Sequence, residues 1–179
     1  VVTNNRSGII SKVAGVLALN GLGVFGAAAH TENNRSLSVF RVERKKDQEI
    51  KWELIEDQVK RALAGRLAVA ARLGERSRFD RKTKATARPV QPRLTVDNET
   101  SEVATVLEIS CLDEPGILYR ITRAFTELDL DIVSARVQTL GSEVIDAFYI
   151  RDQYGNKVED PEHLAEIELA VLRWIGMDL

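Results

Sequence analysis

The clearest alternation of apolar and polar residues lies in the second half of the chain. Thr105–Leu112 alternates with the period of a strand that is covered on one face. An acidic turn, Asp113–Gly116, follows it directly. From Ile117 to Leu128 the apolar residues recur at helical spacing, which predicts a helix with one buried stripe.

Two more strand-like runs complete this unit. Asp131–Thr139 and Val144–Arg151 are joined by Leu140–Glu143, in which a Gly-Ser pair favours a hairpin turn. A broad apolar face over Pro161–Ile175 predicts a second helix. Strand, helix, hairpin and helix in this order are typical of a ferredoxin-like unit.

The pattern occurs twice. When the sequence is shifted by 108, residues 5–43 fall on residues 113–151 without a gap, and the apolar positions stay in register. The matched positions include Gly8 with Gly116, Ile9 with Ile117, Leu22 with Leu130, Ala27 with Ala135, Thr31 with Thr139 and Phe40 with Phe148. The first copy therefore has a helix over Ile9–Leu19, stopped by Asn20-Gly21, and two strands, Val24–Thr31 and Leu37–Glu43.

The segment between the copies is harder to interpret. A helix begins near Trp52, and we expect it to continue to Leu73, before Gly74. Residues 82–92 contain two prolines and no apolar period, which indicates a connector. The short alternating run Arg93–Asp97 is expected to be the fourth strand of the first copy, although the pattern does not settle which sheet it joins.

These elements predict an α+β fold of two ferredoxin-like βαββαβ units with antiparallel sheets, the second unit lacking a fourth strand of its own. The expected domains are residues 1–81 and 93–179, joined by the linker 82–92. In the alternative division, strand 93–97 is shared with the first unit. The two sheets are expected to pack edge to edge, within one chain or across a homodimer.

Composition is that of an ordinary globular protein, with 44% hydrophobic and 29% charged residues among 179. No apolar run reaches the roughly 18–20 residues of a membrane span, and no signal peptide is recognisable. Cys111, the only cysteine, lies on an apolar strand face, so we expect a buried, inert thiol and a cytoplasmic protein. Because the chain starts at Val1 without a methionine, it is interpreted as part of a longer protein.

Charge is unevenly distributed. Residues 66–93 carry 9 basic and 2 acidic side chains, hence +7, whereas residues 94–179 carry 6 basic and 18 acidic side chains, hence −12. The basic stretch could bind nucleic acid weakly through electrostatics, but it holds only one aromatic residue, Phe79, for base stacking. A solvated helix end and linker is the favoured interpretation, and nucleic acid is not an expected partner.

The chain offers little for catalysis. Its two histidines, His30 and His163, belong to no cluster with metal-ligand spacing, and there is no glycine-rich phosphate loop. Asp113 and Glu114 are adjacent at a turn, so they point in different directions and make a poor acid–base pair. We expect no catalytic residue, metal or cofactor here.

The acidic turn carries a resemblance. Asp113–Leu118 resembles the Asp-Arg-Pro-Gly-Leu-Leu signature of ACT domains, which are small-molecule-sensing modules with a βαββαβ fold. With the flanking segments 96–108, 134–137 and 148–149, and with 13–18 and 39–42 in the first copy, the chain is similar to the tandem ACT pair at the carboxyl end of PII uridylyltransferase/uridylyl-removing enzymes.

This resemblance implies that the chain senses glutamine and regulates catalytic domains of the same polypeptide. Those domains are absent here, are expected to use Mg, and act on the PII protein. The resemblance leaves open whether the parent transfers uridylyl or another nucleotidyl group. It also leaves open a rival function, a ligand-free ACT scaffold that only assembles the enzyme.

The helix-start turns are the candidate effector sites. Free backbone N–H groups at the positive helix end suit an α-carboxylate, and glycine allows a close approach. An acidic or amide side chain could accept from the α-ammonium group, and the effector's side chain would lie toward the neighbouring sheet edge. The expected residues are Asp113, Pro115, Gly116, Ile117, Leu118, Ser134 and Arg136 in the second copy, and Asn5, Gly8, Ile9 and Ile10 in the first. The same turns could instead serve only as helix caps.

Overall fold

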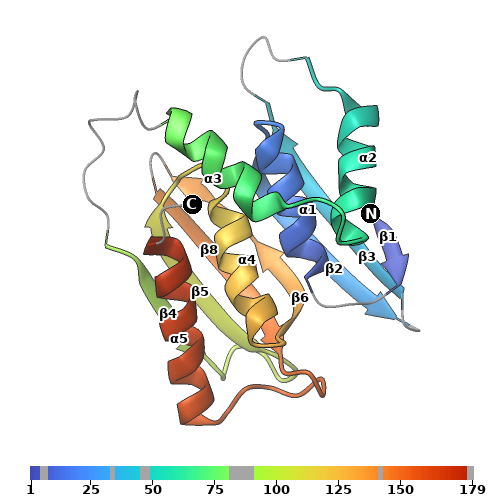
Figure 1. Ribbon diagram of the computed structural model, residues 1–179. Coiled ribbons are helices and arrows are strands. Elements are labelled where there is room, and N and C mark those ends of the chain that lie inside the picture. The colour runs from blue at the N-terminus through green and yellow to red at the C-terminus, as the bar shows by residue number, and fades with distance from the viewer. Residues whose placement is uncertain (5–7, 33–34, 45–48, 81–90, 141–142, 177–179) are drawn as a thin grey trace.

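The strands form a single antiparallel sheet (Figure 1). The computed structural model describes residues 1–4, 8–32, 35–44, 49–80, 91–140 and 143–176. Within these residues the sheet has eight strands in the order β1-β3-β2-β6-β8-β5-β4, with β7 paired to β8. The strands are β1 (Val2–Asn4), β2 (Gly23–Glu32), β3 (Arg35–Glu43), β4 (Arg93–Asp97), β5 (Thr105–Leu112), β6 (Asp131–Arg136), β7 (Thr139–Leu140) and β8 (Glu143–Arg151).

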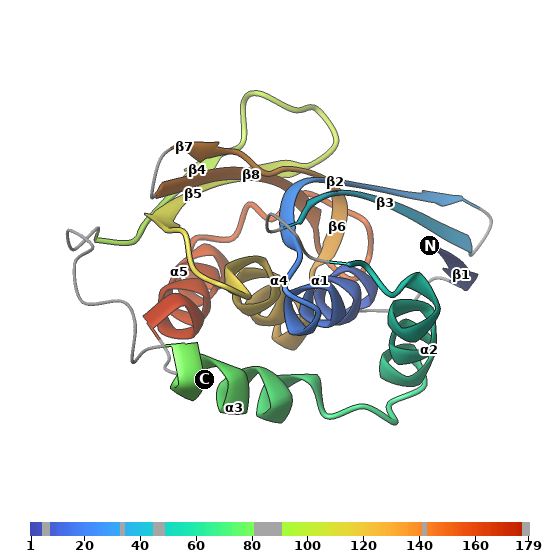
Figure 2. The same ribbon diagram turned by 90° about the horizontal axis from the view of Figure 1, so that it is seen from above.

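The helices cover one face of this sheet and leave the other face open (Figure 2). In the described residues they are α1 (Ile9–Leu19), α2 (Trp52–Leu63), α3 (Val69–Asp80), α4 (Ile117–Glu127) and α5 (Pro161–Gly176). α1 and α4 lie side by side in the middle of the layer, and α3 crosses its outer side. The predicted α+β fold of two ferredoxin-like units is confirmed.

The repeat extends to backbone conformations. Gly8 and Gly116, which match at the shift of 108, precede α1 and α4 with left-handed φ values of 79° and 82°. Gly21 and Asp129 also match, and both follow the helix end with positive φ, 72° and 51°. A left-handed residue just after a helix is a common helix stop, and Asp tolerates it better than most side chains.

Each unit also has a bulge at the same place. The pairing of β2 with β3 skips one residue between Val24 and Gly26. The pairing of β6 with β8 skips one between Ile132 and Ser134, which are the matching positions. Bulges bend a strand and increase its twist. Both inner strands are therefore distorted just before they reach the junction between the units.

The two units join through β2 and β6, which are equivalent strands. Their register pairs Ala27 with Ala135 and Ala28 with Ser134. Ala135 is the match of Ala27, since 27 + 108 = 135, so each unit presents the same position to the other. The junction, called the seam below, thus has the geometry of a two-fold axis between two copies within one chain.

The hydrophobic core crosses the seam. Ile10 and Ala14 of α1 pack in the cluster formed mainly by β5, β8, α4 and α5. In return, Tyr119 of α4 packs among residues of α1, α2 and α3. Because each unit completes the core of the other, changes in their relative position must repack side chains.

Two sequence expectations need correction. Arg93–Asp97 was expected to be the fourth strand of the first unit, but β4 pairs with β5 over its whole length and so completes the sheet of the second unit. The connection through 98–104 is short enough to return β5 antiparallel beside β4, which makes this local pairing the simplest one.

The helix expected to run from Trp52 to Leu73 is two helices. α2 ends at Leu63, where Gly65 has a φ of 72°, and α3 then continues past Gly74 to Asp80. The left-handed glycine ends the first helix. Most of the predicted linker, and the predicted Gly141-Ser142 turn, lie outside the described residues, so the domain boundary at 82–92 stays a prediction.

Candidate functional site

The turn before α4 is well defined. Gly116 takes the left-handed conformation, and the amide of Ile117 donates to the Glu114 carbonyl at 3.0 Å. The Glu114 carboxylate also accepts from Arg120, with an Nη2 to Oε2 distance of 2.5 Å. No side chain caps the start of α4 in the described residues. Asp113 and Pro115 are exposed, so this turn is accessible to solvent.

Each turn touches the other unit. A Cβ placed on Gly8 would lie 3.0 Å from Thr126 Cγ2, at the end of α4. A Cβ on Gly116 would lie 3.9 Å from the Cβ of Ala18, at the end of α1, and 3.7 Å from Leu73 of α3. Ala18 and Thr126 match at the shift of 108, so the two contacts are symmetric. The start of each first helix therefore packs against the end of the other.

Four predicted site residues belong to the core. Ile9, Ile10, Ile117 and Leu118 are 5–6% exposed and pack in the two hydrophobic clusters. Their side chains position the helix starts. Asn5 lies outside the described residues. His30 is exposed on β2, and Cys111 is fully buried, with desolvation raising its pKa to about 12.

A buried carboxyl group lies near the second turn. Asp146 on β8 is 0% exposed, opposite Ile109, and its Oδ1 accepts from the Gln138 amide at 3.3 Å. Its Oδ2 has no hydrogen-bond partner among the described residues. Burial raises the pKa of Asp146 to about 7, and the nearby charge of Asp113 adds to this shift. Ser38 matches Asp146 at the shift of 108 and is also buried. Its hydroxyl group has no hydrogen-bond partner among the described residues.

Sequence reasoning did not single out Asp146. The signal was present, because Asp146 alternates with Val144 and Phe148 on the buried side of β8. An acidic residue in such a position is rare unless it is paired.

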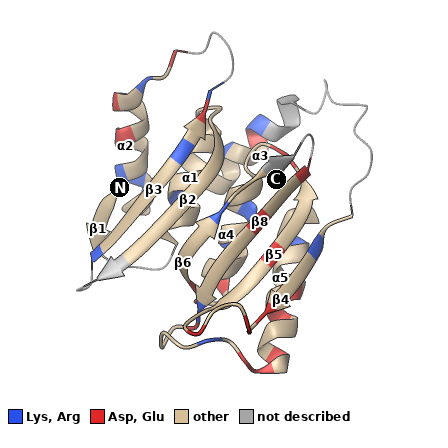
Figure 3. Cartoon of the chain, turned by 180° about the vertical axis from the view of Figure 1, so that it is seen from behind, with Lys and Arg blue, Asp and Glu red and all other residues tan. Residues whose placement is uncertain are grey.

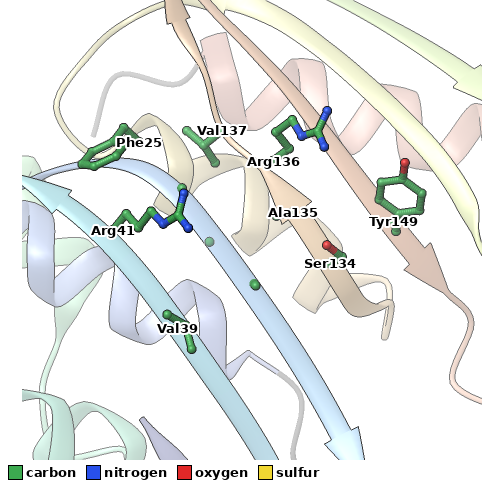
Figure 4. A pocket seen from close by; sticks show the side chains of 11 residues that line it. Phe25, Val39, Arg41, Ser134, Ala135, Arg136, Val137 and Tyr149 are labelled. Atoms are coloured by element: carbon green, nitrogen blue, oxygen red, sulfur yellow. The ribbon is translucent and has the colours of Figure 1, made fainter.

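A hollow of about 490 Å³ lies over the seam on the helix-free face of the sheet (Figure 4). Both units line it, and the lining contains no acidic side chain. The lining residues are Phe25, Gly26, Ala27, Ala28, Val39 and Arg41 from the first unit and Ser134, Ala135, Arg136, Val137 and Tyr149 from the second. We call this hollow the seam pocket.

Two arginines flank Gly26 in the seam pocket. Arg41 pairs with Gly26 across β3 and β2. One step beyond the Ala27–Ala135 pair, the same register brings Arg136 opposite Gly26 from β6. Figure 3 shows this face, with the ribbon coloured for basic residues on β3 and β6. Arg41 reaches over β2 (Figure 4), and a Cβ on Gly26 would lie 3.5 Å from its Cδ.

The predicted site residues thus fall into two places. Ser134 and Arg136 line the seam pocket, together with Gly26 and Ala28. The turn residues Asp113, Pro115, Gly116 and Gly8 do not line it, because they lie beside the helix layer. Arg41 and Tyr149, which sequence reasoning missed, match each other at the shift of 108. Both residues line one pocket only because of the register at the seam, which a single sequence does not give.

No group of three or more His, Cys, Asp and Glu side chains is arranged to hold a metal ion within the described ranges. None of the helices described is long and apolar enough to cross a membrane.

Two ferredoxin-like units joined edge to edge, with an Asp-x-Pro-Gly turn at the start of a first helix, define a tandem ACT-like module. Residues 93–174 match the family described as "ACR9-like, ACT-like domain".

The chain is homologous over almost its whole length to the carboxyl-terminal region of bifunctional uridylyltransferase/uridylyl-removing enzymes. It is 35% identical to that enzyme of Rhodospirillum rubrum over 177 residues, which cover 96% of this chain and 19% of the relative. The enzymes of Gluconobacter oxydans and Azospirillum brasilense are 31% and 32% identical, again over 96% of this chain and 19% of theirs. The chain therefore spans about a fifth of the length of these curated relatives.

One solved structure, described as an unknown protein from Galdieria sulphuraria, matches 97% of this chain and 86% of its own, at 16% identity and a TM-score of 0.31.

Proposed function

We propose that this chain is the amino-acid-sensing regulatory region of a PII-modifying nucleotidyltransferase, and that glutamine is its effector. The homology to uridylyltransferase/uridylyl-removing enzymes supports the parent activity. In this proposal the chain carries out no catalysis, works in the cytoplasm, and acts on catalytic domains of the same polypeptide. The effector's identity comes from the resemblance to that family alone.

One observation carries the regulatory part of the proposal. Gly116 packs against Ala18, and Gly8 against Thr126, so each helix-start turn lies against the other unit. A ligand that inserts at a turn must therefore contact both units or push them apart. Its binding energy then depends on their relative orientation, which is the requirement for transmitting a signal.

The turn before α4 is the favoured site. Among the described residues, no side chain caps its helix start, and Asp113 is exposed, so the turn offers amide donors for an α-carboxylate and an acceptor for an α-ammonium group. The first unit has Asn5 and Ser7 where the second has Asp113 and Pro115. We propose that the second site dominates.

The alternative is a scaffold that binds no ligand. The shared core across the seam supports it, because Ile10, Ala14 and Tyr119 each pack in the cluster of the other unit. Such packing would also serve a module that only assembles the enzyme.

Calorimetric titration separates the two functions. The 179-residue chain would be titrated with glutamine, with glutamate and asparagine as controls, and the titration repeated on Asp113→Ala. We expect saturable glutamine binding that weakens by about tenfold or more in the variant, since a charge-assisted hydrogen bond contributes roughly 1.5–3 kcal/mol.

Asp129→Ala is unsuitable as a control because Asp129 has a positive φ, and Asp160→Ala is unsuitable because Asp160 accepts from the His163 amide at the start of α5. Glu166→Ala is the control, because it removes an exposed carboxylate on α5. Binding that survives in Asp113→Ala would move the site away from the second turn. The absence of heat with any of the three amino acids at millimolar concentration would favour the scaffold.

A further inference from the structure

Two like charges line the seam pocket, Arg41 and Arg136. Arg41 and Arg136 are both exposed and face the hollow from opposite sides of Gly26. In the described part of the chain no salt bridge involves either of them. The carboxylate of Glu108 lies in the same cross-strand row as Arg136, but on β5, beyond Ala147 of β8.

The other side chains that line the seam pocket supply hydroxyl groups and apolar surface. Ser134 and Tyr149 supply hydroxyl groups, and they are directly opposite each other on β6 and β8. Phe25 and Val39 supply apolar surface and are 48% and 52% exposed. At about 490 Å³ the seam pocket is within the range of small-molecule sites, which is roughly 300–1,000 Å³.

We infer that the seam pocket binds a small organic dianion, a phosphate ester or a dicarboxylate, whose charged group lies between Arg41 and Arg136. Guanidinium groups bind both anions through paired, charge-assisted hydrogen bonds. The Ser134 and Tyr149 hydroxyls donate to the remaining oxygens, and the apolar part of the ligand packs on Phe25 and Val39. This site lies on the helix-free face, so it is separate from the proposed glutamine site at the turns.

Gly26 leaves room for the Arg41 stem at the floor of the seam pocket. The Arg41 stem lies across this glycine, where a Cβ would meet its Cβ and Cδ at 3.5 Å each. Since that is ordinary van der Waals contact, a larger residue at position 26 is compatible with the fold and would occupy the floor of the site. The residue therefore provides a test that does not alter charge.

The test is a set of titrations of the 179-residue chain at constant ionic strength. The probes are adenosine monophosphate, inorganic phosphate and glutarate, with the uncharged diamide glutaramide as a control for glutarate. We expect saturable binding of at least one dianion, weakened by about tenfold or more in Arg41→Gln and in Arg136→Gln, because each loses a charge-assisted pair. Gly26→Val should weaken binding while leaving the unfolding midpoint close to that of the parent.

Arg93→Gln is the matched control. Arg93 is exposed on the same face at the far edge strand, β4, and does not line the seam pocket. Binding of adenosine monophosphate or phosphate, but not glutarate, would assign a phosphate site, and the reverse would assign a dicarboxylate site.

The inference is overturned if no probe binds with a Kd of about 10 mM or below, or if Arg93→Gln weakens binding as much as Arg41→Gln. Glutaramide binding as tightly as glutarate would also overturn it. Because Asp113→Ala leaves the seam pocket intact and Arg41→Gln leaves the turns intact, each variant should lose only one ligand.

Discussion

At the scale of single residues, the Asp146 carboxyl is a buried acidic group whose hydrogen bonding is incomplete among the described residues. It is fully buried, one of its oxygens has no hydrogen-bond partner in the described residues, and burial raises its pKa to about 7. A neutral carboxylic acid fits this environment better than a carboxylate. The protein therefore holds a proton at Asp146 that an unfolded chain releases above pH 4.

This proton makes stability depend on pH. A pKa raised on folding means that the native state binds more protons than the unfolded state between pH 4 and 7. The contribution of Asp146 is thus most favourable below pH 4 and is lost progressively as pH rises to about 7. The loss could reach about 4 kcal/mol, at roughly 1.4 kcal/mol per pH unit.

We predict that Asp146→Asn removes this dependence. Denaturant titrations at pH 5, 6.5 and 8 should show the parent losing stability with rising pH and the variant losing much less, so that the variant is the more stable of the two at pH 8. Glu108→Gln, at an exposed position on the adjacent strand, should keep the slope of the parent. An unchanged slope in Asp146→Asn would show that Asp146 does not carry the effect.

At the scale of elements, the crossing of α1 with α3 and α4 depends on Gly15. A Cβ at this position would lie 2.3 Å from Val69 Cγ1 and 2.8 Å from Tyr119 Cδ2. Both neighbours are stiff side chains, so they cannot give way without moving a helix.

We predict that Gly15→Val destabilises the chain by about 1–3 kcal/mol, which is the usual effect of overpacking a core. The unfolding midpoint in denaturant would measure it. Gly176→Val is the control, because a Cβ there meets none of the described residues within 4 Å. Adding Val69→Ala to Gly15→Val should restore part of the loss; a Gly15→Val variant as stable as the parent would mean that the helices are free to separate.

Elements also mark where sequence reasoning succeeded and where it failed. The shift of 108 located both first helices and their inner strands, because glycine and apolar positions are fixed by backbone and core requirements. It could not assign β4, since a five-residue strand alternates in the same way whichever sheet it joins. The separate helix α3 was missed because apolar spacing continues past Gly65, while the left-handed turn there does not alter that spacing.

At the scale of the whole molecule, the seam is the feature on which both proposals depend. The register that pairs Ala28 with Ser134 brings Arg41, Gly26 and Arg136 into one row. The sequence analysis placed Ser134 and Arg136 in one effector site with Asp113. It could not show that they line the seam pocket, which Asp113 does not line. Contacts between residues about 108 positions apart decide which edge strands of the two units pair. The periodicity along one strand does not contain this information.

We predict that Ala28→Cys with Ser134→Cys forms a disulfide across the seam. Directly opposite antiparallel residues have Cα atoms about 4.5–5.5 Å apart, within the disulfide range. The only native cysteine, Cys111, is buried with a raised pKa and should not compete. Non-reducing electrophoresis and mass measurement would detect the bond.

The oxidised form would test the mechanism. If glutamine prefers one relative orientation of the units, its affinity should differ between the oxidised and reduced forms of the double variant. Single-cysteine variants, oxidised in parallel, control for the substitutions. Equal affinity in both forms would argue against a signal carried by rotation at the seam.

Joining the two units in one polypeptide has a consequence for the seam pocket. In a dimer of identical chains, each residue that lines the pocket would be present in two symmetry-related copies. A ligand could then bind equally well in two opposite orientations. Here Arg41 has Tyr149 as its counterpart and Arg136 has Ala28, which places both positive charges on one side of the axis. The difference between the two copies gives the seam pocket a polarity, and that polarity favours one orientation of a bound anion over the reverse.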